Sequence, residues 1–69
     1  MKNVNNVNEL VEILSNLDIV ICDSIKIQNM TIDLFYDTVI DKFVLFDKCE
    51  WTFDTLDEME SYLVEEYQL

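Results

Sequence analysis

Five residue types are missing from this chain: glycine, proline, alanine, arginine and histidine. The loops that cradle nucleotide phosphates need glycine for close approach of the backbone, so no loop of that kind is expected. Histidine is the commonest general base and metal ligand, and arginine clamps phosphate or carboxylate groups with paired hydrogen bonds. These absences argue against nucleotide-dependent, zinc-dependent and histidine-based catalysis.

Positive charge is also scarce. Four scattered lysines stand against fifteen Asp and Glu residues, which gives a formal net charge of −11. Such a chain repels nucleic acid and anionic membranes, so direct binding to either is not expected. We expect it instead to bind a basic surface of another protein, because opposite fields steer the encounter.

The chain has 69 residues, and we interpret residues 1–69 as one small domain, because no linker or repeat interrupts them. Its hydrophobic fraction of 51% is too high for a disordered acidic tail. The start lacks the apolar run of a signal peptide, and no apolar run approaches the roughly 20 residues of a membrane span. These features predict a cytoplasmic protein in which Cys22 and Cys49 are reduced and buried, with a Cys22–Cys49 bridge as the alternative.

Apolar spacing predicts two amphipathic helices. The first spans residues 4–17 and has Asn6 and Glu9 in the pattern of a capping box, although Asn3 offers an earlier start. The second spans residues 55–67 and begins with a capping box of Thr55 and Glu58. The expected buried stripes are Val4, Val7, Leu10, Val11, Leu14 and Leu17 in the first helix, and Leu56, Met59, Leu63 and Tyr67 in the second.

Residues 18–53 are rich in the β-branched and aromatic residues that favour strands. We expect strands at residues 19–22, 25–28, 30–36 and 43–47, the last resuming through Phe53. Turns are expected at Asp23–Ser24 and within residues 37–42, and a bulge or a turn is expected at Asn29. No crossover helix separates these strands, which favours antiparallel pairing. The predicted fold is α+β: a helix, a three- to four-stranded antiparallel sheet and a helix, in a two-layer mini-domain.

No catalytic, cofactor or metal site is expected. Asp33 and Asp37 share a strand face but lie about 13 Å apart, too far for a glycosidase pair. Asp54, Asp57 and Glu58 could offer oxygen ligands to calcium or magnesium, but acids also gather at helix starts because of the helix dipole. The capping interpretation is favoured.

Two aromatic features leave alternatives open. Phe35 shares its strand face with Asp33 and Asp37, so it is either an exposed apolar centre rimmed by acids or a core residue beneath a helix. Trp51 either anchors an interface or packs with Phe53 beneath the second helix, and packing is favoured.

The acidic residues suggest either simple solvation of the surface or recognition of a partner. One form of recognition is mimicry of a nucleic acid, whose phosphates carry one charge per roughly 3.4 Å along a strand. The alternative is an acidic interaction module, or a homodimer, that does not mimic nucleic acid. The candidate partner-binding residues are Asp33, Phe35, Asp37, Asp41, Asp47 and Glu50 on the sheet side, and Asp57, Glu58 and Glu65 on the helix side.

Residues 5–14 with residues 18–21, and the acidic hairpin over residues 33–47, resemble small acidic inhibitors encoded by phages and prophages, of the anti-CRISPR and DNA-mimic anti-restriction kinds. The resemblance implies a stoichiometric inhibitor that occupies the DNA-recognition surface of a host defence protein, such as a Cas nuclease. It also implies that the protein acts in the cytoplasm of the host cell.

Overall fold

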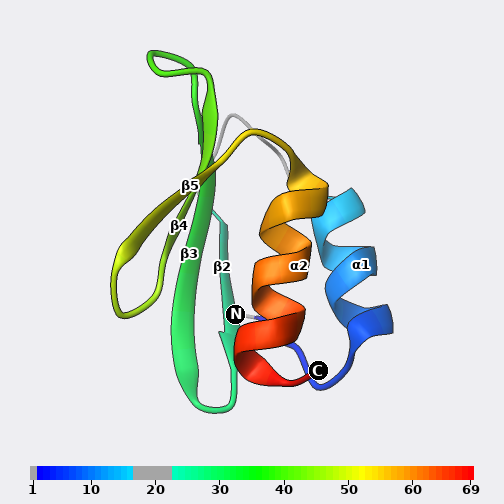
Figure 1. The fold of residues 1–69 in the computed structure, drawn as a ribbon. Helices are drawn as coiled ribbons and strands as arrows, with labels where there is room; N and C mark the ends of the chain where they lie inside the picture. Colours follow the sequence, from blue (N-terminus) through cyan, green and yellow to red (C-terminus); the bar gives the residue numbers. More distant parts are fainter. Residues whose placement is uncertain (1, 17–22) are drawn as a thin grey trace.

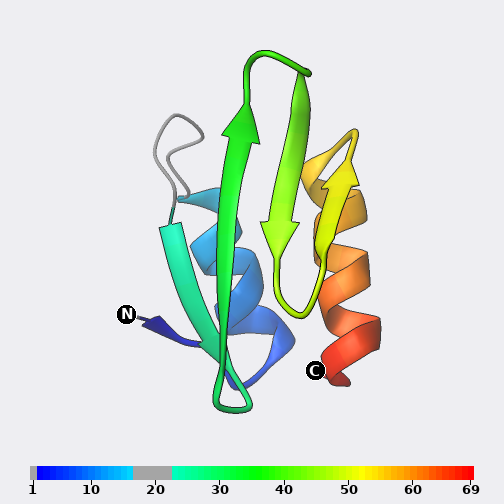
Figure 2. The same ribbon diagram turned by 90° about the vertical axis from the view of Figure 1, so that its left-hand side faces the viewer.

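The computed structural model describes residues 2–16 and 23–69, and within them the chain forms two helices and a five-stranded sheet. The elements are β1 (Lys2–Asn3), α1 (Val7–Ser15), β2 (Asp23–Ile27), β3 (Met30–Asp37), β4 (Lys42–Phe46), β5 (Glu50–Phe53) and α2 (Leu56–Tyr67). The strands lie side by side in chain order (Figures 1 and 2). The predicted α+β class is therefore confirmed.

The first strand corrects two expectations. β1 precedes α1 and pairs in parallel with β2, so within the described residues the sheet has five strands instead of the predicted three or four, and it is mixed and not purely antiparallel. The Val4 N–H donates to the Lys26 carbonyl at 2.8 Å and continues this pairing. Val4, which was predicted to lie in the first helix, is buried but precedes that helix. Helix α1 begins after Asn6, whose Oδ1 accepts from the Glu9 N–H at 2.9 Å and caps the helix.

Strands β2, β3 and β4 lie close to the strands predicted at residues 25–28, 30–36 and 43–47, whereas Glu50–Phe53 is a separate strand antiparallel to β4 and does not continue it. Asp23 and Ser24 begin β2 and pair with β3, so the turn expected there is wrong. The strand expected at residues 19–22, like Leu17, lies outside the described residues. Gln28 and Asn29 form the two-residue turn between β2 and β3 with φ of 52° and 65°. Positive φ at both central positions suits hairpin twist, and Asn29 tolerates it without glycine.

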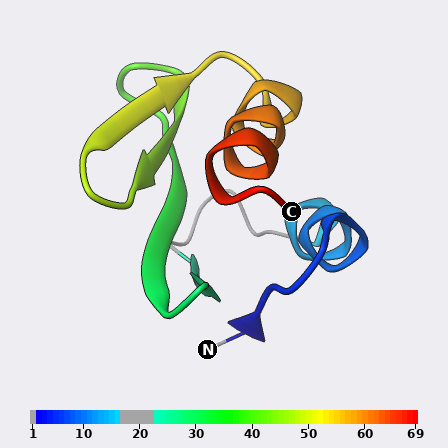
Figure 3. The same cartoon turned by 60° about the horizontal axis from the view of Figure 1, so that its bottom comes forward.

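Both helices cover the same face of the sheet (Figure 3). The main core lies between the layers and comprises Val4, Leu10, Ile13, Leu14, Ile25, Ile27, Ile32, Leu34, Leu45, Met59, Leu63 and Tyr67. In α1 the buried stripe is rotated relative to the prediction: Ile13 is buried, whereas Val7 and Val11 are 37% and 43% exposed. The reason is that α2 and the sheet together cover only the side of α1 that carries Leu10, Ile13 and Leu14.

Helix α2 matches its sequence pattern closely. The Thr55 Oγ1 accepts from the Glu58 N–H at 3.2 Å, which confirms the cap. Met59, Leu63 and Tyr67 are buried, and Leu56 is half-buried. This stripe holds α2 against the sheet and against α1, leaving the opposite face of the sheet uncovered by either helix (Figures 2 and 3).

Candidate protein-binding site

The face of the sheet that points away from the helices is called the open face below, and Figure 2 looks onto it. Cross-strand partners point to the same side of a sheet, so the register arranges this face in rows. One row contains Ser24, Asp33, Phe46 and Glu50; the next contains Phe35, Val44 and Thr52; a third contains Asp37 and Lys42. Of the predicted site residues, four meet here: Asp33, Phe35, Asp37 and Glu50.

Phe35, Val44 and Phe46 form an apolar patch at the centre of the open face. The Phe35 and Phe46 rings stack with their centroids 6.0 Å apart and their planes at 17°. Val44 is only 1% exposed, yet it is separate from the core beneath the helices. Phe46 is 40% exposed and Phe35 is half-buried. Within the described residues, Phe35 therefore lies at the centre of an acid-bordered patch that neither helix covers.

Acidic side chains border this patch. Asp33 and Glu50 flank Phe46 on its two neighbouring strands, which places their backbones about 10 Å apart. Asp33 also accepts a hydrogen bond of 2.5 Å from the Ser24 hydroxyl, which fixes its carboxylate on this face. Asp37 lies across from Lys42 at the far end. The border is thus predominantly negative and partly preorganised.

Lys42 is surrounded by acids. Its ammonium pairs with the Asp54 carboxylate, and this hydrogen bond, together with the charges of Asp54, Glu58 and Asp41, raises the pKa of Lys42 above its usual value. The pair joins β4 to the segment that leads into α2. It also brings the predicted residues Asp41 and Glu58 to the same end of the molecule.

Asp47 does not join the open face. It follows Phe46 by one residue and points to the helix side, where its Oδ2 accepts from the Tyr62 hydroxyl at 2.6 Å and the Tyr67 hydroxyl at 2.9 Å. Its Oδ1 accepts from the Trp51 indole N–H and the Cys49 N–H, both at 3.1 Å. Asp47 therefore ties the β4–β5 hairpin to α2, and its carboxylate is occupied within the fold.

These contacts shift the acidity of all three side chains. Burial alone raises the pKa of the Asp47 carboxyl, but the four hydrogen bonds outweigh it, the one from Tyr62 most strongly, and lower the pKa to about 2. Burial, followed by hydrogen bonding to Asp47, raises the pKa of both Tyr62 and Tyr67. The sequence did not indicate that Asp47 binds these tyrosines, because they lie 15 and 20 residues from it and no local motif links them.

The predicted helix-side acids form a separate group. Asp57, Glu58 and Glu65 are exposed along α2, where with Phe53 and Tyr62 they line a shallow depression beside β5. The fold therefore divides the predicted acids between the open face, the α2 surface, the β3–β4 connection that carries Asp41, and the internal Asp47 contact.

The aromatic residues of β5 pack toward α2, as favoured from the sequence. The Trp51 and Phe53 rings have centroids 5.3 Å and 5.7 Å from that of Tyr62. Trp51 nevertheless remains 42% exposed. Cys49 is an exposed free thiol in the β4–β5 turn, which corrects its expected burial, and Cys22 lies outside the described residues.

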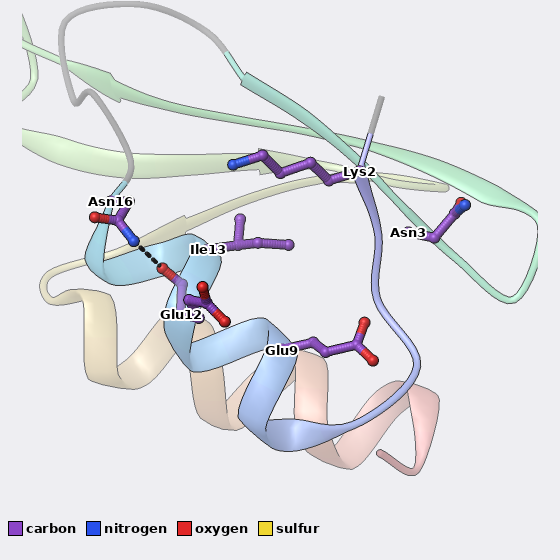
Figure 4. A pocket seen from close by; sticks show the side chains of 6 residues that line it. All are labelled: Lys2, Asn3, Glu9, Glu12, Ile13 and Asn16. Atoms are coloured by element: carbon purple, nitrogen blue, oxygen red, sulfur yellow. Dashed lines mark hydrogen bonds between the residues drawn. The ribbon is translucent and has the colours of Figure 1, made fainter.

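A hollow of about 360 Å³ lies between β1 and α1 (Figure 4). Lys2 and Asn3 line it from one side, and Glu9, Glu12, Ile13 and Asn16 from the other. The Asn16 amide donates to the Glu12 carbonyl at 2.9 Å and ends the helix there. Small-molecule sites are mostly apolar with a few polar groups, whereas five of these six residues are polar, so the open face is the better candidate site.

Over residues 2–16 and 23–69, no three Cys, Asp or Glu side chains are grouped so as to hold a metal ion, and no helix has the length and apolarity needed to cross a membrane. Asp54, Asp57 and Glu58 thus do not converge on one point, and Asp54 instead pairs with Lys42.

No protein-family model matches this chain, and comparison with curated proteins and with solved structures finds no significant match.

Proposed function

We propose that this protein is a non-catalytic, stoichiometric inhibitor that binds a basic, nucleic-acid-handling surface of another protein, such as a host defence nuclease. The observation that carries the proposal is the open face, where an apolar patch is bordered by Asp33, Asp37 and Glu50 in a chain of net charge −11. An apolar centre within a polar rim is the usual anatomy of a protein–protein interface. The negative rim favours a basic partner, and nucleic-acid-binding proteins carry basic surfaces.

Binding by itself would inhibit the partner, because this protein would occupy the surface that otherwise holds nucleic acid. The carboxylates of Asp33 and Asp37 on β3 and of Glu50 on β5, with Asp33 about 10 Å from Glu50 and about 13 Å from Asp37, would meet several of the cationic groups that otherwise hold phosphates, without copying the phosphate spacing. The charged rim would speed association and make it sensitive to salt. The apolar patch would slow dissociation, because Phe35 and Phe46 would lose their remaining contact with water.

A second candidate function is favoured by the apolar patch itself. An acidic interaction module, or a homodimer, would use Phe35, Val44 and Phe46 as its principal contact and would not compete with nucleic acid. Its binding would depend weakly on salt, because burial of apolar surface is not screened.

A pull-down distinguishes the two candidate functions. The folded protein is immobilised and exposed to a bacterial lysate, and the bound proteins are eluted from one sample with duplex DNA and from another with 500 mM salt. The proposal expects mass spectrometry to identify the same nucleic-acid-binding proteins in both eluates. Partners that resist both treatments would instead establish the interaction module, and sedimentation of the purified protein at two concentrations would detect the homodimer.

Two sets of variants locate the contact. The triple variant Asp33→Asn, Asp37→Asn and Glu50→Gln should lose at least 10-fold in affinity for the captured partner at low salt. The matched control removes three acids from the helix layer, as Glu12→Gln, Glu60→Gln and Glu66→Gln, and should change affinity by less than 3-fold. Equal losses in the two variants would show that net charge alone matters, and the open face would no longer be the proposed contact.

A further inference from the structure

The connection between β3 and β4, residues 38–41, places two adjacent apolar side chains in solvent. Val39 is 91% exposed and Ile40 is 48% exposed. The connection extends beyond the ends of α2 and β5 (Figures 1 and 2). Asn, Asp, Ser and Gly are the residues that favour turns, so Val39 and Ile40 are not explained by turn formation, and neither belongs to the core.

The tip of this hairpin is held in shape by local contacts. The Asp37 Oδ1 accepts from the Val39 N–H at 2.9 Å, and Asp41 adopts the left-handed backbone conformation with φ of 57°. At the base of the tip, the Tyr36 and Phe43 rings contact edge to face, with centroids 4.9 Å apart. A preorganised tip loses little conformational entropy when it binds.

The charge around the tip indicates the chemistry of its partner. Asp41 is exposed beside Ile40. The nearby Lys42 is paired with Asp54, and this hydrogen bond, followed by the charges of Asp54, Glu58 and Asp41, raises the pKa of Lys42. An anionic membrane would be repelled by these carboxylates, and a second copy would bring a further net charge of −11. A protein surface that carries lysine or arginine beside an apolar pocket is complementary to both features.

We infer that the hairpin tip inserts Val39 and Ile40 into an apolar pocket bordered by basic side chains on the partner protein. The inference rests on the proposed function and adds a second contact to the open face. One partner can reach both contacts, because β3 and β4 carry the tip at one end and Phe35 and Val44 along their length.

The first experiment places the photo-crosslinking residue p-benzoylphenylalanine at position 39 or at position 52, where Val39 and Thr52 are exposed. After irradiation in a bacterial lysate, the same basic protein should be crosslinked from both positions. Crosslinking from position 52 alone would overturn the tip contact and leave the proposed function standing. Failure at both positions would overturn both.

The second experiment measures affinity for the protein crosslinked from position 52. The variant Val39→Ser with Ile40→Ser should bind roughly 30-fold more weakly, with an unchanged urea midpoint. The matched control, Val7→Ser with Val11→Ser, removes two exposed valines from α1 and should bind within 2-fold of wild type. Equal affinities for the tip variant and wild type would overturn the inference.

Two further experiments test whether the hairpin tip binds a membrane or a second copy of this chain instead of a protein partner. Vesicles of phosphatidylcholine and phosphatidylglycerol should not cosediment with the protein, and binding to them that depends on Val39 and Ile40 would replace the protein partner with a membrane. Likewise, a dimer in sedimentation equilibrium that the tip variant dissociates would assign the tip to a second copy. Either result would overturn the inference.

Discussion

Val44 and Leu45 are consecutive residues of β4, and both are almost inaccessible to water, with 1% and 0% exposure. They are buried by different neighbours. Leu45 points to the helix side and lies in the cluster between the sheet and the two helices, whereas Val44 points to the open face, outside that cluster. The stacked rings of Phe35 and Phe46 lie on its side of the sheet.

The two faces also use their acids differently. On the helix side, the Asp47 carboxylate accepts four hydrogen bonds and holds β4–β5 against α2. On the open face, Asp33 accepts from one serine hydroxyl, and Glu50 is exposed. The acid on the helix side therefore stabilises the fold, while the open face leaves carboxylates and part of its apolar surface accessible to solvent.

The largest effect should come from truncating Leu45. The variant Leu45→Ala should lower the free energy of unfolding by about 3 kcal/mol, because it leaves a cavity between the layers. That is a large part of the roughly 3 to 10 kcal/mol expected for a chain of this size. Val44→Ala should cost about 1 kcal/mol, since its neighbours on the open face can rearrange. Equal losses in urea titrations would show that the two faces are equally constrained.

A sharper comparison uses two aromatic residues of similar exposure on opposite faces. Trp51 is 42% exposed and Phe46 is 40% exposed. Trp51→Ser should cost about 2.5 kcal/mol, because it removes the ring contact with Tyr62 and the hydrogen bond to Asp47. Phe46→Ser should cost about 1 kcal/mol. Urea midpoints that fall in the reverse order would contradict the roles assigned to the two faces.

Asp47→Asn should lower the free energy of unfolding by about 2 kcal/mol, because hydrogen bonds to a charged group are worth more than neutral ones. The control Asp41→Asn replaces an exposed acid at the hairpin tip and should change stability by less than about 0.5 kcal/mol. Thermal and urea unfolding of both variants measure the difference. A neutral effect of Asp47→Asn would mean that the tyrosine contacts do not stabilise the hairpin.

The contribution of Asp47 to the free energy of unfolding should depend on pH. Because the folded state lowers the pKa of Asp47 from 3.8 to about 2, its contribution is complete above about pH 4 and is lost as the pH falls through about 2. The stability difference between wild type and Asp47→Asn should therefore be constant from pH 7 to pH 5 and shrink below pH 4. Comparing the two chains cancels the protonation of the surface carboxylates. A difference that does not depend on pH would contradict the lowered pKa.

Much of the fold was predictable from the sequence. The alternation of Ile32 and Leu34 with Asp33 and Phe35 assigned β3 to a two-faced strand, and Thr55 marked the start of α2. The parallel strand β1 was not predictable, because two residues carry no periodicity and their pairing with β2 depends on contacts across more than twenty residues. The rotation of the α1 stripe depends on where α2 lies, which local spacing does not encode.

The candidate site was predictable only in part. Asp33, Phe35 and Asp37 share one face because of strand periodicity alone. The sequence did not show that Val44 and Phe46 complete the patch, because that depends on the β3–β4 register. It also placed Asp47 among the binding acids, whereas the packing of α2 brings Tyr62 and Tyr67 to its carboxylate.

The sequence by itself determined the net charge, the helix caps and the two-faced character of the strands, because these depend on composition and on neighbours within a few residues. Only the tertiary structure decided which face of the sheet the helices cover, and therefore which acids are held internally and which remain exposed. The physical reason is that side-chain environment is set by contacts between segments distant in sequence, and short-range periodicity does not specify them.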